Sequence, residues 1–199
     1  MNMMKKELKK REELESTVKV LQSSVAVFQK QIKELRRDQE ELQQYDRRLL
    51  VRVDGIPLEE KETSEDVLTK VKSLITEAKC EIPDAVIDRA HRIGKVYKDK
   101  NSKELCKSVI VRFTTFRHRT KFYYARNSLK NVKVKLDLTK ERYGIYKEAL
   151  DLVENHSKVS YAMVDINCRL KVVLKNGKGI FFTDIESLKN ILEEISIPQ

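Results

Sequence analysis

A heptad pattern runs from Leu14 to Leu42 and predicts one long helix. Apolar residues recur at alternating steps of four and three, and no glycine or proline occurs before Gly55. A stripe this narrow buries too little surface for a lone helix, so we expect it to pair with copies of itself. The sequence therefore predicts an oligomerising coiled coil over residues 1–46. Its buried seam comprises Leu14, Val18, Leu21, Val25, Phe28, Ile32, Leu35 and Leu42.

The number of strands in this coil is left open by two residues. β-Branched residues at the a positions with leucine at d favour a dimer, but Phe28 stands at d. Polar Gln39 occupies an a position and is expected to fix the register. An amphipathic helix that packs on its own domain is the alternative.

Residues 47–137 alternate between the two periodicities of strands and helices. Strands are expected at 49–54, 85–93, 108–114 and 132–136, with helices at 64–79 and 115–129 and a long polar loop at 94–107. The resulting order, β-α-β-β-α-β, is that of the ferredoxin-like split βαβ arrangement. RNA recognition motif (RRM) domains use the open face of such a sheet to bind single-stranded RNA.

The pattern restarts after Asp137 and predicts a small α/β C-terminal domain over residues 138–199. Thr139 can cap a helix, and Asn176-Gly177 is a strong hairpin signal between two strands. A further strand is expected at 159–164, and Thr183 opens a capping box for a last helix. The whole chain is therefore predicted to be α+β: a coiled coil, an RRM-like domain and a domain of helix, three short strands and helix.

Positive charge is concentrated in one folded stretch, from Arg89 to Lys135. It holds fifteen lysines and arginines against two acids, a net charge of +13 in a chain whose total is +10. The strand-like run 108–113 lies in its middle, so the charge belongs to a folded domain. A localised basic field of this kind is typical of a polyanion binder, most often of nucleic acid.

Charge replaces aromatic rings where an RRM would stack bases. Ser108 and Ile110 stand at positions where aromatic residues are expected, and Arg52 occupies the stacking position of the first strand. Tyr123 and Tyr124 are candidates for base stacking, although Tyr123 fits a core position equally well. The sequence therefore predicts binding that is dominated by phosphate contacts, tolerant of RNA sequence and sensitive to salt.

The motifs of enzymes, metal sites and membrane spans are missing from the sequence. Its three histidines fall in different predicted elements, and its three cysteines lack metal-ligand spacing, which favours reduced intracellular thiols. No apolar run approaches the ~20 residues of a membrane span, and the N-terminus does not read as a signal peptide. We expect a non-enzymatic protein without cofactor, metal or membrane partner.

Four segments in this order resemble the first-open-reading-frame protein of LINE-class retrotransposons. They are Arg48-Leu-Leu-Val-Arg-Val-Asp-Gly-Ile-Pro57, Ile87-Asp-Arg-Ala-His-Arg-Ile-Gly94, Ser108-Val-Ile-Val-Arg-Phe-Thr114 and Asp137-Leu-Thr139. The resemblance implies a coiled-coil homo-oligomer, a trimer in the vertebrate type, whose RRM and C-terminal domains jointly grip single-stranded RNA. It also implies a nucleic-acid chaperone that packages its transcript in a ribonucleoprotein of the cytoplasm and, in part, the nucleus.

Candidate nucleic-acid contacts follow from the charge pattern and from this resemblance. By position, Arg52, Arg112 and the bases around 117–126 match family arginines credited with RNA contact, and Lys140 and Arg142 match a basic site of the C-terminal domain. The full candidate set is Arg52, Arg89, Arg92, Lys103, Lys107, Arg112, Arg117, Arg119, Lys121, Arg126, Lys140 and Arg142. Single-stranded DNA is an alternative ligand. The alternative function is that of the related baculovirus few-polyhedra protein, a coiled-coil scaffold that acts through protein partners.

Overall fold

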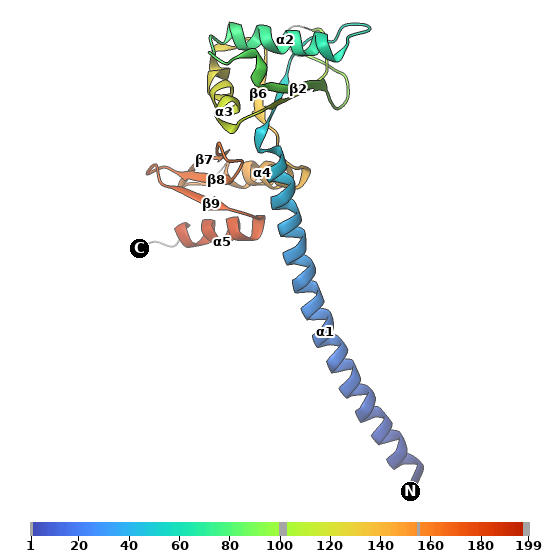
Figure 1. The fold of residues 1–199 in the computed structure, drawn as a ribbon. Helices are drawn as coiled ribbons and strands as arrows, with labels where there is room; N and C mark the ends of the chain where they lie inside the picture. Colours follow the sequence, from blue (N-terminus) through green and yellow to red (C-terminus); the bar gives the residue numbers. More distant parts are fainter. Residues whose placement is uncertain (1, 100–102, 155, 197–199) are drawn as a thin grey trace. The chain divides into compact units, whose positions relative to one another are not determined.

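The computed structural model describes residues 2–99, 103–154 and 156–196 (Figure 1). The fold is mixed α+β, with a long N-terminal helix and antiparallel sheets. The chain divides into two compact units, residues 1–43 and 44–199. Residues 47–137 and 138–199, which the sequence predicts as separate domains, thus belong to one compact unit, although each has its own hydrophobic core. No helix in the described ranges is long and apolar enough to cross a membrane.

The first unit consists of helix α1 (Asn2–Asp46), whose last residues extend into the second unit. The helix is as long as the heptad pattern predicts. All eight residues of the predicted seam are exposed, from 49% for Val18 to 69% for Leu42. Within the described chain, therefore, nothing covers this apolar stripe.

The larger of the two main sheets has the order β2-β5-β1-β6, with every neighbouring pair antiparallel. Its strands are β1 (Leu50–Asp54), β2 (Ile87–Arg92), β5 (Val109–Phe113) and β6 (Lys133–Leu136). Helices α2 (Ser64–Glu77) and α3 (Phe116–Ala125) cover one face of this sheet (Figure 1). The core between sheet and helices includes Val51, Val53, Val71, Val111, Phe113 and Phe122. The predicted order of strands and helices is confirmed.

Two details of this part differ from the prediction. Helix α2 is capped by Thr63, one residue before the predicted Ser64, through a capping box with Asp66. The loop at 94–107 contains a short hairpin of β3 (Tyr97–Lys98) and β4 (Leu105–Cys106). These strands are too short for a period of two to show, and β4 is held from outside by a bridge between Cys106 and Pro57.

The remaining elements follow the predicted order of helix, three strands and helix. They are α4 (Lys140–Val153), β7 (Val159–Val164), β8 (Leu170–Leu174), β9 (Gly179–Phe182) and α5 (Ile185–Ser196). The strands form an antiparallel sheet in the order β7-β8-β9. Ala149 and Val153 of α4 and Leu188 and Leu192 of α5 pack against Val172 and its neighbours in a second core.

Polar contacts join the end of α1 to the start of α4. The Gln44 side chain donates to the carbonyl of Asp137 and accepts from the amide of Thr139, each at 2.9 Å. Arg47 pairs with the Asp137 carboxylate at 2.9 Å. Burial raises the pKa of Asp137, and the charge and hydrogen bond of Arg47 offset only part of that rise.

Candidate nucleic-acid interface

The sheet face opposite the core carries most of the basic residues of β1, β2, β5 and β6. We call it the outer sheet face. Strand pairing places Arg89 beside Arg112, and it places His91, Ile110, Arg52 and Lys135 in one row across the four strands. Neither α2 nor α3 covers this face, because both helices pack against the valines on the other side. Arg52, Arg89, His91 and Arg112 therefore share the outer sheet face.

One carboxylate organises the middle of the outer sheet face. Asp54 Oδ1 accepts from Ser108 Oγ at 2.6 Å and from Arg52 Nε at 3.2 Å, and Asp54 Oδ2 accepts from Lys135 Nζ at 2.8 Å. Burial raises the pKa of Asp54, but the hydrogen bonds from Lys135 and Ser108 and the nearby charges outweigh it, so the net pKa is lowered from its ordinary 3.8. Asp54 is thus ionised at neutral pH and holds Arg52 and Lys135 in place.

The rest of the outer sheet face is more open. Arg112 reaches Asp88 at 3.4 Å, with both side chains about half exposed at 42% and 50%. Such an exposed pair contributes little to stability and competes weakly with another anion. Arg89 and Lys133 are exposed. A phosphate group that approaches here meets cations that are only loosely paired.

Helix α3 adds a second set of cations. Arg117 and Lys121 are exposed and lie four residues apart, so they share one side of the helix. Arg126, just beyond the helix, is half-buried: it donates to the carbonyl of Tyr123 at 2.7 Å and lies 3.9 Å from the centre of that ring. Tyr123 itself packs against the core, whereas Tyr124 is 62% exposed.

The other candidates are spread over further elements. Lys103 and Lys140 are exposed, and Lys107 is half-buried between β4 and β5. Lys140 is the first residue of α4 and belongs to the C-terminal part of the chain. The structure does not bring these three lysines into the row formed by Arg52 and Lys135.

Three arginines of the candidate set, Arg92, Arg119 and Arg142, are largely buried and bond to groups of the protein itself. Arg92 has a side chain only 9% exposed, pairs with Glu62 at 2.7 Å and donates to the carbonyls of Ile56 and Lys107. It lies on the core side of β2, opposite Val109. There it holds the segment after β1 against the start of β5.

Arg119 and Arg142 are both buried beside the loop between β7 and β8. Arg119 is fully buried and donates to the carbonyls of Arg48 at 2.8 Å and Ile166 at 2.9 Å. Its Nη2 has no hydrogen-bond partner among the described residues, and burial lowers its pKa. Arg142 is buried and donates to the carbonyl of Cys168 at 3.0 Å. Both arginines thus bind carbonyls of the loop between β7 and β8.

Two lysines of the outer sheet face were missing from the candidate set. Lys133 and Lys135 pair with Asp54 and Arg52 across β1 and β6. The sequence pattern could have identified them. Val134 and Leu136 are apolar, and because side chains alternate between the two faces of a strand, Lys133 and Lys135 lie on the other face. The sequence did not show that β6 lies beside β1 rather than at a distance from Arg52.

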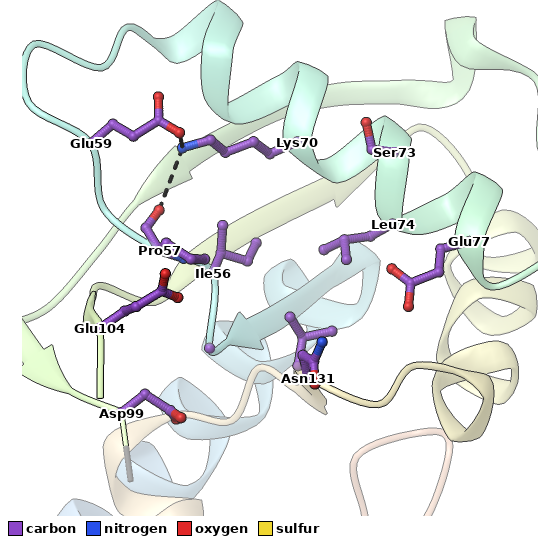
Figure 2. Close-up of a pocket in the computed structure, with 12 residues that line it drawn as sticks. Ile56, Pro57, Glu59, Lys70, Ser73, Leu74, Glu77, Asp99, Glu104 and Asn131 are labelled. Carbon is purple, nitrogen blue, oxygen red and sulfur yellow. Dashed lines mark hydrogen bonds and ion pairs between the residues drawn. The ribbon is translucent and has the colours of Figure 1, made fainter. Parts of the chain in front are cut away.

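The described residues also form a cavity of about 580 Å³ between α2 and the segment that follows β1 (Figure 2). Its floor is apolar, and its rim carries the carboxylates of Glu59, Glu77, Asp99 and Glu104. Lys70 at this rim is paired with Glu59 at 2.9 Å. Carboxylates repel phosphate groups, so this cavity does not belong to the basic surface.

In comparisons with known proteins, no protein-family model matches the chain, and no curated protein sequence matches it.

Proposed function

We propose that this protein is a non-enzymatic homo-oligomer that binds single-stranded RNA across the outer sheet face and the exposed side of α3. The observation that carries the proposal is the cluster of cations on the sheet face opposite α2 and α3, with Arg52, Arg89, Arg112, Lys133 and Lys135 on one surface. Phosphate contacts from such a surface supply affinity without reading the sequence.

The strand order supports the view that residues 47–137 are an RRM-type domain. The order is β2-β5-β1-β6, with two helices on the opposite face, which is the arrangement in which RRM domains present a sheet to RNA. Because the positions where an RRM would carry stacking aromatic residues hold Ser108 and Ile110, this sheet favours phosphate contacts over base stacking. Ser108 and Ile110 are both buried, and Ser108 is bound to Asp54.

The exposed stripe of α1 supports self-association as the second half of the proposal. Eight large apolar side chains at heptad spacing are exposed on one helix, which is unfavourable in water. A coiled coil with copies of the same chain would cover them and would join several RNA-binding faces in one particle. We further propose, on the motif resemblance, that this particle packages and remodels the RNA of a LINE-type retrotransposon.

The salt dependence of RNA binding tests the proposal. Affinity for poly(U) should fall steeply with salt, with a slope of log K against log salt of about −0.7 for each phosphate neutralised. Engagement of several cations predicts a slope of roughly −3 or steeper. Light scattering of the same samples should show one oligomer that gains mass with RNA. Failure to retain RNA at low salt, combined with a tight protein partner, would favour the scaffold function instead.

A further inference from the structure

The sheet of β7, β8 and β9 has an outer face of its own, opposite the core that it shares with α4 and α5. Strand pairing places Tyr161 beside Val173 and Gly179, and it places Met163 beside Lys171 and Phe181. Tyr161 is 50% exposed and Phe181 is 45% exposed. Large aromatic side chains on an open sheet face invite a ligand with flat, apolar surfaces.

Two cations are held against Phe181. The Arg169 guanidinium carbon lies 4.2 Å from the centre of the ring, and the Lys171 ammonium lies 5.6 Å from it. The Lys171 side chain crosses Gly179 so closely that a Cβ atom at this position would collide with it. Arg169 is also fixed by Asp165 at 2.8 Å. The aromatic surface is therefore bordered by positive charges in defined places.

Further lysines lie at the hairpin end of the same sheet. Lys175 and Lys178 flank the turn between β8 and β9, and the amide of Lys175 donates to the carbonyl of Lys158 at 3.0 Å. All three side chains are exposed. The face and its hairpin end thus combine two exposed rings with five cations, namely Arg169, Lys171, Lys158, Lys175 and Lys178.

We propose that this surface, defined by Tyr161, Phe181, Arg169 and Lys171, is a second binding site for single-stranded nucleic acid that stacks bases. Rings and cations that alternate on one surface match a single strand, whose bases stack on aromatic side chains while its phosphates meet lysine and arginine. A protein-binding face would instead be depleted of charge at its centre, and here Lys171 lies between Met163 and Phe181. The inference rests on the proposed function and extends it, because the first surface offers charge and this one offers stacking.

Stacking and charge leave different signatures in a salt titration of the full-length protein with poly(U). The double variant Tyr161→Leu/Phe181→Leu keeps apolar bulk but removes both rings. It should bind about tenfold more weakly at every salt concentration, with an unchanged slope, because base stacking does not release counterions. The variant Lys175→Ala/Lys178→Ala should instead make the slope less steep, by about 0.7 for each lysine that binds a phosphate in the wild type.

Matched controls distinguish the loss of an aromatic ring from a general effect on folding. Tyr161→Phe keeps a ring and should bind like the wild type, whereas Tyr161→Leu alone should weaken binding. Tyr143→Ala removes a tyrosine of α4 with similar exposure, 53%, and should leave binding unchanged. Photocrosslinking of 5-iodouridine RNA to the wild-type chain provides a readout that needs no variant, and it should label the peptides that contain Tyr161 or Phe181.

The outcomes distinguish this inference from the proposed function. If the wild type binds RNA but the leucine variants bind equally well and no crosslink falls on β7 or β9, the second surface is refuted and the first stands. If the wild type itself binds no RNA, both are refuted. If the double variant unfolds, the crosslinks and the pair Tyr161→Phe and Tyr161→Leu decide the question.

Discussion

At the scale of single residues, Asp54 acts as an internal counterion for a cationic surface. Its two carboxylate oxygens together hold Arg52, Ser108 and Lys135. A phosphate group that binds Arg52 or Lys135 must therefore compete with this carboxylate. Asp54 fixes the positions of these cations and at the same time lowers their affinity for phosphate.

Replacement of Asp54 by asparagine should strengthen RNA binding. Each cation that moves from Asp54 to a phosphate should steepen the slope of log K against log salt by about 0.7. Because Arg52 and Lys135 are partly exposed, the free energy of unfolding should stay within about 1 kcal/mol of the wild type. Weaker binding by Asp54→Asn would show that ordering of Arg52 outweighs the competition.

The same carboxylate gives a pH dependence with a defined sign. The folded-state pKa of Asp54 is lowered, so its stabilising contribution is present above the unfolded pKa and is lost as the pH falls through the folded pKa. Urea titrations of wild type and Asp54→Asn should therefore converge as the pH falls below about 4. If the free energies of unfolding of the two proteins still differ below that pH, ionisation of Asp54 is not the cause of the difference.

Arg89 and Arg92, three residues apart on β2, should respond in opposite ways to alanine substitution. Arg92→Ala removes the ion pair with Glu62 and the hydrogen bonds to the carbonyls of Ile56 and Lys107. Although Lys70 still pairs with Glu62, the loss of charged hydrogen bonds should lower the free energy of unfolding by about 3 kcal/mol. Arg89→Ala removes an exposed side chain and should change stability by less than about 0.5 kcal/mol. Binding of RNA should show the reverse order, with Arg89→Ala weaker and folded Arg92→Ala near the wild type. Equal losses of binding would mean that the outer sheet face is not the contact surface.

At the scale of single elements, α3 presents two exposed cations, Arg117 and Lys121, on one side of the helix. Arg117→Ala/Lys121→Ala should keep the melting temperature and lose RNA affinity by about tenfold. The matched control is Lys147→Ala/Lys189→Ala, which removes two exposed lysines from α4 and α5. If both pairs weaken binding equally, the charge acts as a diffuse field rather than through α3.

Helix α3 also shows which features of the structure local sequence patterns can predict. Period and capping signals predicted the order of all long elements, because alternation in the strands and the 3.6-residue period in the helices are local properties. Arg119 was assigned to RNA because it is one of the basic residues clustered around 117–126. Its burial depends on the carbonyl of Ile166, 47 residues away, and no local pattern reports that contact. Lys135 was left out for a related reason, since only the pairing of β6 with β1 places it beside Arg52.

The exposed seam of helix α1 allows a direct test of self-association. Val25→Asp/Ile32→Asp places charges on the predicted seam and should yield a monomer in sedimentation equilibrium, because an unpaired buried charge costs several kcal/mol. Val20→Asp/Val27→Asp is the matched control. These valines are equally exposed, at 62% and 54%, but lie off the seam. An oligomer that survives the first change, or is lost with the second, would place the interface elsewhere on the helix.

At the scale of the whole molecule, oligomerisation should govern the affinity for long RNA. Linked sites convert later binding steps into intramolecular ones, and avidity can exceed single-site affinity by about 10²–10⁴. The monomeric Val25→Asp/Ile32→Asp variant should therefore bind a long homopolymer far more weakly than the wild type. Both proteins should bind an oligonucleotide that spans one site with similar affinity per chain. If the monomer binds the long homopolymer as tightly as the wild type, α1 does not contribute to RNA binding.

The position of β1 fixes the order in which a growing chain can complete its parts. β1 is made before the other strands of its sheet, yet it pairs with β5 and β6, the last two of them. The two hydrogen bonds of Gln44 join residues 93 and 95 positions apart. The ribosome must therefore deliver residue 139 before these bonds can form, whereas α1 needs only its own neighbours. Each nascent chain thus has its helix ready to meet other copies while its basic face is still unfolded.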